Sequence, residues 1–284
     1  MKFVPMLGLL GKALSEGYAV PSFYVWNAES MVAVLRAAVK LEAPVILMNG
    51  PGEFPLLHPA DMAAIARSLH VETSLPVALH LDHGDSLSLV RDCLDVGYTS
   101  VMLDFSSKPL EENARALQTV VGMAHPLGVT VEGEIGSVGK IEDSSLEGNR
   151  PSTLTDPQEA CEYVRITGVD TLAISIGNAH GNYTELPRLR FDILEEVFAL
   201  VNIPLVLHGS SGTPDEDINK AISLGIAKIN VASELVRSVR ESLLEQWKAG
   251  QNLWVPSAEV EAMKDMESVV MKWIIKTGAA GRAQ

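Results

Sequence analysis

Three histidines, His83, His180 and His208, each precede a glycine, in LHLDHG, GNAHG and LVLHGS. Two of them follow short β-branched or aliphatic runs, which places their imidazoles at strand ends. A single histidine is more often a satisfied core or surface residue. Three in one context match the three protein nitrogens that a catalytic zinc ion takes, with a fourth position left for water or substrate. The pattern therefore predicts a metal site.

Eight short apolar runs alternate with amphipathic segments along the chain. The runs cover residues 18–25, 44–50, 76–84, 100–106, 129–136, 171–177, 204–210 and 226–233. Helical spacing occupies 30–41, 59–70, 87–96, 110–124, 157–167, 191–201 and 214–224. Eight βα units predict an α/β fold, a (β/α)8 TIM barrel, and the count makes an open doubly wound sheet the weaker alternative.

Helix boundaries support this register. Thr213 and Glu216 resemble a capping box, and Thr155 or Asp156 can cap the helix that starts at Pro157. Two further helical segments, 233–249 and 257–276, extend beyond the barrel minimum. Extra C-terminal helices of this kind predict a subunit contact, and we expect a homodimer or homotetramer.

Composition restricts the class of protein. The 284 residues, 47% hydrophobic, can form one domain over 1–284. The net charge of −14 argues against a nucleic-acid partner, so an anionic substrate must be held by local groups. No apolar run approaches the ~20 residues that span a membrane, and two cysteines give no disulfide framework. We expect a cytoplasmic protein that acts on a small molecule.

In a TIM barrel the chemistry lies at the C-terminal ends of the strands. Polar residues gather there in this sequence: the three histidines, Asp82, Asp104, Glu132, Glu134, Asn230 and Ser233. Neighbouring residues on a strand face opposite sides. Asp82 and His83 therefore both reach the site only if the strand ends near Asp82 and Gly84 lets the backbone leave the extended conformation. Asp82 is then either a partner that fixes an imidazole or an acid-base group.

Small residues after the last three strands predict an anion site. The segments GNAHGN, HGSSGT and NVAS offer backbone amides, and barrels often bind phosphate there. Each segment alone is also compatible with an ordinary tight turn. The polar stretch 139–153 is the longest connection and is predicted to be a mobile loop over the site.

These motifs together resemble the class II, zinc-dependent ketose-bisphosphate aldolases. The matching segments include AVPSFYVWN, PVILMNGPGEF, LHLDHGDSL, VEGEIGSVGKIED, TLAISIGNAHGNY, PLVLHGSSGTPDEDI and GIAKINVASEL. The resemblance runs from about Tyr18 to Ala283. PGEF and the GRA ending make the chain most similar to the tagatose-1,6-bisphosphate aldolases, with the fructose-1,6-bisphosphate aldolases next.

The resemblance implies a role for each matching residue. It assigns His83, His180 and His208 to the zinc ion, and Asp104 and Glu134 to an alternative metal position. Asp82 and Glu142 become the proton-transfer residues, the latter in the loop. The phosphate and ketone end is assigned to Gly181, Gly209, Ser210, Ser211, Asn230, Val231, Ala232 and Ser233. A monovalent cation, Na⁺ or K⁺, is expected near Gly181 and Gly209, and Arg282 is expected to meet the distal phosphate.

The chain departs from the family pattern near the aldehyde end of the substrate. Tyr24 replaces a common asparagine, Phe105 and Ser107 replace a small residue and a histidine, and Lys140 replaces a glycine. The expected reaction is reversible aldol cleavage of a ketose 1,6-bisphosphate to dihydroxyacetone phosphate and an aldehyde such as glyceraldehyde 3-phosphate. A related ketose 1-phosphate, including a sulfonated sugar, is the alternative substrate.

Two other functions use the same residues. A metal-dependent sugar epimerase or isomerase would reprotonate the same enediolate without breaking the carbon bond. A non-catalytic subunit that stabilises an aldolase would have lost the histidine ligands, and all three are present. The chain could itself need such a stabilising partner.

Overall fold

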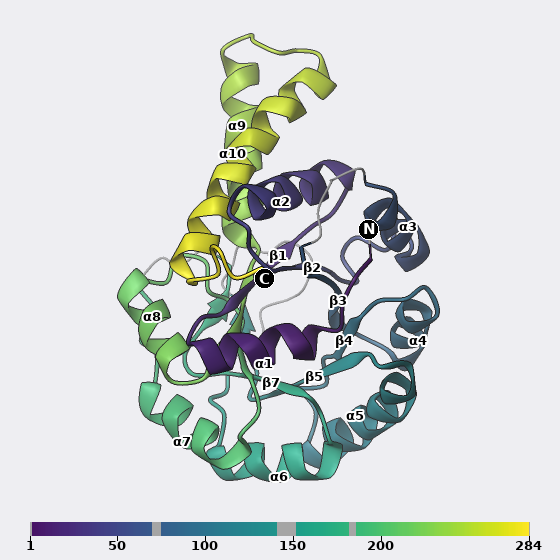
Figure 1. Cartoon of the computed structure of the whole chain (residues 1–284), viewed down its shortest axis with the longest axis vertical. Coiled ribbons are helices and arrows are strands. Elements are labelled where there is room, and N and C mark those ends of the chain that lie inside the picture. Colours follow the sequence, from purple (N-terminus) through teal and green to yellow (C-terminus); the bar gives the residue numbers. More distant parts are fainter. Residues whose placement is uncertain (1, 70–74, 141–151, 182–185, 284) are drawn as a thin grey trace.

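The computed structural model describes residues 2–69, 75–140, 152–181 and 186–283. Eight parallel strands close into a barrel in the order β1-β10-β9-β7-β5-β4-β3-β2, as Figure 1 shows. The strands are β1 (Val20–Tyr24), β2 (Val45–Asn49), β3 (Val77–Gly84), β4 (Ser100–Leu103), β5 (Thr130–Ile135), β7 (Thr171–Ile174), β9 (Leu205–Leu207) and β10 (Ile226–Val231). The predicted TIM barrel is confirmed, because each strand lies within one of the eight apolar runs.

The helices that follow β1 to β9 surround the barrel as predicted, and two more helices follow β10. They are α2 (Ala28–Lys40), α3 (Pro59–Ser68), α4 (Leu87–Asp95), α5 (Leu110–Ala124), α6 (Pro157–Thr167), α7 (Phe191–Val201), α8 (Asp215–Ser223), α9 (Ser233–Lys248) and α10 (Val255–Lys276). Asp156 caps α6 by accepting from two backbone N–H groups. The capping box at Thr213 is wrong: α8 begins after Pro214 without a side-chain cap, and the Thr213 hydroxyl is buried with no hydrogen bond.

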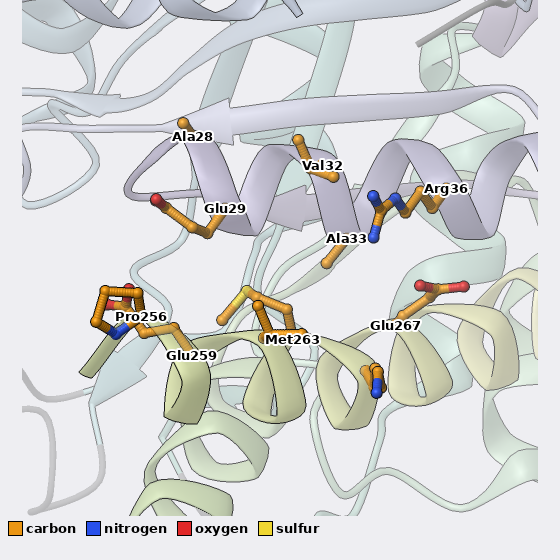
Figure 2. Close-up of a pocket in the computed structure, with 11 residues that line it drawn as sticks. Ala28, Glu29, Val32, Ala33, Arg36, Pro256, Glu259, Met263 and Glu267 are labelled. Carbon is orange, nitrogen blue, oxygen red and sulfur yellow. The ribbon is translucent and has the colours of Figure 1, made fainter. Parts of the chain in front are cut away.

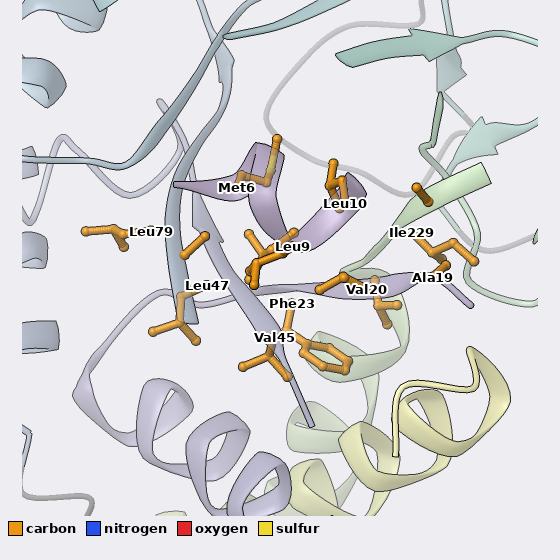
Figure 3. Close-up of a cluster of buried hydrophobic side chains, with 14 of the residues drawn as sticks. Met6, Leu9, Leu10, Ala19, Val20, Phe23, Val45, Leu47, Leu79 and Ile229 are labelled. Carbon is orange, nitrogen blue, oxygen red and sulfur yellow. The ribbon is translucent and has the colours of Figure 1, made fainter. Parts of the chain in front are cut away.

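Helix α1 (Met6–Glu16) was not among the predicted elements. It precedes β1 and lies across the N-terminal end of the barrel, where the Leu7 amide donates to Thr130 Oγ1 at 2.9 Å. Met6, Leu9 and Leu10 belong to the buried cluster that contains Val20 and Leu79 (Figure 3). The helix thus closes the end of the barrel opposite the predicted site.

The last two helices form a hairpin that projects beyond the barrel (Figure 1). A groove of about 390 Å³ lies between α10 and α2, with Val32, Ala33 and Met263 among its lining residues (Figure 2). The far end of the hairpin exposes Leu253 and Trp254, which are 74% and 73% accessible. No helix in the described ranges is long and apolar enough to cross a bilayer.

A polar network fills the barrel interior beneath the C-terminal mouth. Lys228 and Glu132 are fully buried, and the ammonium donates to both carboxylate oxygens at 2.8 and 3.1 Å. Lys228 Nζ also lies 3.3 Å from His80 Nε2, and His80 Nδ1 lies 2.8 Å from Ser100 Oγ. Burial opposes ionisation of Glu132, but Lys228 and His208 lower its pKa to about 2. The carboxylate is therefore charged at neutral pH and needs its buried partner.

Removal of the ammonium should destabilise the fold. Lys228→Met leaves the Glu132 carboxylate buried without its counter-charge, which costs about 3–5 kcal/mol of unfolding free energy. Urea denaturation measures this loss. The matched control is Lys264→Met, which removes an exposed pair with Glu261 on α10 and should cost less than about 0.5 kcal/mol. An equal loss in both variants would contradict the role of the buried pair.

Candidate active site

The three histidines of the predicted metal site converge at the C-terminal mouth. The ring centroid of His83 lies 5.0 Å from that of His180 and 4.7 Å from that of His208. His83 Nε2 and His208 Nδ1 face each other at 3.0 Å. One potential ligand atom of each histidine lies within 4.8 Å of those of the other two. His180 is 97 positions after His83 and 28 positions before His208 in the chain, and the fold brings all three together.

His83 reaches this point through an irregular backbone. It has a φ of +46°, and the pairing of β3 with β4 shifts register between Leu81 and Gly84. This β-bulge turns His83 toward the same region as its neighbour Asp82. The sequence predicted that Gly84 would let the backbone leave the extended conformation, but the residue with the left-handed conformation is His83 itself. Gly84 is needed for another reason: a Cβ there would lie 2.6 Å from the Met102 carbonyl oxygen.

A second glycine brings the other two histidines together. Gly209 follows His208 with a φ of +60°, and a Cβ on it would lie 2.2 Å from the Ala179 carbonyl oxygen. Ala179 and His180 form β8 (Ala179–His180), which pairs with β6 (Gly139–Lys140) outside the barrel. The backbone of the loop after β9 thus packs directly against the strand that carries His180.

Carboxylates hydrogen-bond two of the imidazoles at the ring nitrogen that points away from the cluster centre. Asp104 Oδ2 lies 3.0 Å from His83 Nδ1, and Glu132 Oε1 lies 2.9 Å from His208 Nε2. Each of these rings therefore directs its other nitrogen toward the cluster centre. A carboxylate on the remote ring nitrogen fixes the tautomer and raises the basicity of a metal-binding histidine.

The electrostatics of the cluster are dominated by acidic groups. Burial disfavours the imidazolium, but Asp82, Asp104 and Glu134 outweigh it and raise the pKa of His83 to about 10. Burial, followed by the charge of Asp104, raises the pKa of Glu134 to about 7. Such a site attracts positive charge, which a cation can supply in place of protons.

The residues present fit a zinc ion. Glu134 Oε2 is buried with no hydrogen bond and lies 3.6 Å from His208 Nδ1, beside the two facing imidazole nitrogens. Three imidazoles with nearby carboxylates form a donor set that zinc prefers. Asp104 and Glu134 also form a second possible metal group with His83, as the sequence predicted for an alternative position.

Asp82 lies at the edge of the metal cluster. Its Oδ1 accepts a 3.0 Å hydrogen bond from Asn230 Nδ2, and its Oδ2 lies 4.0 Å from His83 Nε2. Burial would raise the pKa of this carboxyl, but His83, followed by a hydrogen bond from His80, holds it well below its usual range. The carboxylate is therefore ionised. Its side chain keeps 13% exposure, so a substrate can reach it.

The residues predicted for the phosphate follow β8, β9 and β10 at the same mouth. Ser211 Oγ accepts from the Glu234 amide in the first turn of α9, which joins the loop after β9 to the start of that helix. Ala232 and Ser233 stand at the N-terminus of α9, and Gly181 has a φ of +109° after β8. Ser210 instead donates to the Leu207 carbonyl, and the Val231 side chain is buried in the core.

The structure does not bring Arg282 to the candidate site. Arg282 lies at the opposite end of the barrel, where its guanidinium contacts Glu16 at 3.1 Å and the ring of Tyr18. The backbone N–H groups of its neighbours Gly281 and Ala283 donate hydrogen bonds to the carbonyls of Leu41 and Glu42, just after the end of α2. Glu142 and most of the predicted loop, residues 141–151, lie outside the described residues.

Two contributors were missed by the sequence analysis. Lys228 holds Glu132, and Glu53 lies at the mouth near Asp82. A lysine in the apolar run IAKINV, two residues before Asn230 and on the same strand face, was the available signal for the first. Glu53 follows β2 in an irregular segment, where the sequence carries no periodicity to place it.

The chain belongs to the class II fructose-bisphosphate aldolase family, whose model matches residues 4–282. The family predicted from the motifs is thereby confirmed, and the protein is an aldolase, a carbon–carbon lyase. The YdjI aldolase from Escherichia coli K12 is 34% identical, with a TM-score of 0.88 over 100% of both chains.

Two solved structures with lower sequence identity have the same fold. One from Coccidioides immitis, assigned to the fructose-1,6-bisphosphate aldolases, is 28% identical over 98% of this chain and 97% of its own, with a TM-score of 0.84. Fructose-bisphosphate aldolase from Campylobacter jejuni is 23% identical over 97% and 94%, and its TM-score of 0.80 shows the same fold.

Metal content should depend on the cluster in a graded way. His208→Ala should abolish stoichiometric zinc binding, because it removes one of the three imidazoles. Asp104→Asn should weaken zinc binding about 10–100-fold, because it loosens the His83 ring. Mass spectrometry of the metal after dialysis, with competition by a chelator, measures both. His58→Asn, which alters an exposed histidine at the start of α3, is the control and should bind zinc normally. Full zinc content in His208→Ala would contradict this assignment.

Proposed function

We propose that the protein catalyses reversible, zinc-dependent aldol cleavage of a ketose 1-phosphate to dihydroxyacetone phosphate and an aldehyde. The observation that carries the proposal is the cluster of His83, His180 and His208 beside the ionised carboxylate of Asp82. Family membership supports cleavage over epimerisation. The three histidines would hold the zinc ion, which supplies Lewis-acid stabilisation of negative charge on the substrate oxygens.

Asp82 is the proposed acid-base residue. Its carboxylate would accept the proton of the C4 hydroxyl as the C3–C4 bond breaks and the C4 oxygen becomes the aldehyde. The electron pair of that bond stays with the three-carbon fragment, which then needs a proton at C3. Glu142 is proposed to supply it. Asn230 orients Asp82 through the 3.0 Å hydrogen bond.

The start of α9 and the adjoining loops are proposed to bind the substrate 1-phosphate. The first N–H groups of a 16-residue helix lack intrahelical acceptors and attract anions. Gly181, Gly209 and Ser211 lie on the loops that meet there. A monovalent cation near Gly181 and Gly209 is proposed with this subsite.

Removal of the proton acceptor should separate catalysis from metal binding. Asp82→Asn should lower kcat about 10²–10⁴-fold while zinc content stays unchanged, because the amide cannot accept the hydroxyl proton. The measurement is a coupled assay of dihydroxyacetone phosphate release from tagatose and fructose bisphosphates, their 1-phosphates and a sulfonated analogue. Asp85→Asn, an exposed carboxylate three residues away, is the control. Release that resists a chelator, or an epimerised product without cleavage, would refute the proposed reaction.

We propose further that the chain forms a homodimer or homotetramer through the α9–α10 hairpin. Trp254, Leu253 and Val260 are 73%, 74% and 57% exposed at and near its tip, and contiguous apolar surface of this kind is typical of an interface. Light scattering after size-exclusion chromatography should show an oligomer for the native chain and a smaller species for Leu253→Ser/Trp254→Ser. A native monomer would contradict the proposal.

A further inference from the structure

Tyr24 and Glu53 form a hydrogen-bonded pair at the mouth of the barrel. Tyr24 ends β1 beside Met48 of β2, and its hydroxyl donates to Glu53 Oε1. Glu53 lies shortly after β2, and its other oxygen accepts from the Gly50 amide at 2.9 Å. Two contacts from different segments therefore fix the carboxylate, while both side chains remain partly exposed.

The pair adjoins the proposed acid-base residue. β2 and β3 pair in register from Val45 with Val77 to Asn49 with Leu81, so the segment after β2 lies next to Asp82. Gly50 approaches so closely that a Cβ on it would lie 2.5 Å from the Asp82 carbonyl oxygen. The pair follows β1 and β2. β2 adjoins β3, which carries Asp82, whereas β1 adjoins β10, after which one of the loops proposed for the 1-phosphate begins. This position fits the part of the substrate beyond C4.

The chemistry of this corner favours hydroxyl groups over an anion. The carboxylate oxygens of Glu53 and the phenol oxygen of Tyr24 can accept hydrogen bonds from the hydroxyl groups of a polyol. The Trp26 ring lies 6.2 Å from the Tyr24 ring at 37° and adds an apolar face for sugar C–H groups. A phosphate here would meet the like charge of Asp82 and, at a pH above about 7, that of Glu53. Burial, against the bond from Gly50, raises the pKa of Glu53 to about 7, with a further contribution from Asp82.

We propose that Tyr24 and Glu53 form the subsite for the aldehyde half of the substrate, and that they select an uncharged, hydroxyl-bearing chain over a phosphorylated one. The inference rests on the proposed aldolase function and deepens it. It replaces the bisphosphate expected from the sequence with a ketose 1-phosphate whose far end is a neutral polyol.

The test uses the condensation direction with the zinc-loaded protein. Dihydroxyacetone phosphate is combined with glyceraldehyde, with glyceraldehyde 3-phosphate, and with propionaldehyde, which has the same carbon length and no hydroxyl. The variants are Tyr24→Phe and Glu53→Gln. Glu162→Gln, which changes an exposed glutamate on α6, is the matched control. The kcat/KM for each aldehyde and the KM for dihydroxyacetone phosphate are measured.

The native chain should prefer glyceraldehyde to glyceraldehyde 3-phosphate at least tenfold. Tyr24→Phe should lower kcat/KM for glyceraldehyde about tenfold and leave propionaldehyde unchanged, because only the former loses a hydrogen bond. Glu53→Gln should narrow the discrimination against the phosphorylated aldehyde. The KM for dihydroxyacetone phosphate should not change.

A native preference for glyceraldehyde 3-phosphate, or an equal loss for glyceraldehyde and propionaldehyde in Tyr24→Phe, would overturn this subsite while the aldolase function stands. Failure to condense any aldehyde, with zinc shown to be bound, would overturn the proposed function and this inference together. Thermal melting of each variant separates a loss of folding from a loss of selectivity, and the inference requires that Tyr24→Phe remain folded.

Discussion

The structure depends on a line of hydrogen-bonded polar side chains inside the barrel. Lys228 neutralises Glu132, Glu132 orients His208, His208 faces His83, and Asp104 holds His83 from the far side. Each group in the line is costly to bury alone and is satisfied by the next. The polar barrel interior therefore does two tasks: it fills space that aliphatic layers occupy in other barrels, and it sets the directions of the imidazoles.

Much of this arrangement could be predicted from the residues. The eight strands, most helix boundaries and the meeting of three histidines follow from period, strand ends and the rule that parallel strands present their C-terminal ends together. The left-handed backbone of His83 could not be predicted, because nothing local requires it, and the tertiary pairing of β3 with β4 imposes the bulge. Helix α1 was not predicted because it precedes β1 and belongs to none of the eight βα units.

Arg282 shows that a matching sequence motif does not by itself predict where a residue lies in the fold. Its sequence context matches the family, yet the backbone around it is tied to the end of α2 at the closed end of the barrel. Sequence context identifies a residue, but the path of the chain decides which face it reaches. The same reasoning applies to Tyr24 and Glu53, which are remote in sequence and become one group only because β1 and β2 are neighbours.

The short pairing of β6 with β8 joins two parts of the site. Gly139 and Lys140 are in register with Ala179 and His180, so the backbone that leaves β5 and the backbone that carries a candidate metal ligand are one hydrogen-bonded unit. Any shift of one strand displaces the other. Occupancy of the candidate metal position and the placement of Gly139 and Lys140 are then thermodynamically linked. By reciprocity, a ligand that favours one placement of these two residues changes the affinity for the metal by the same factor.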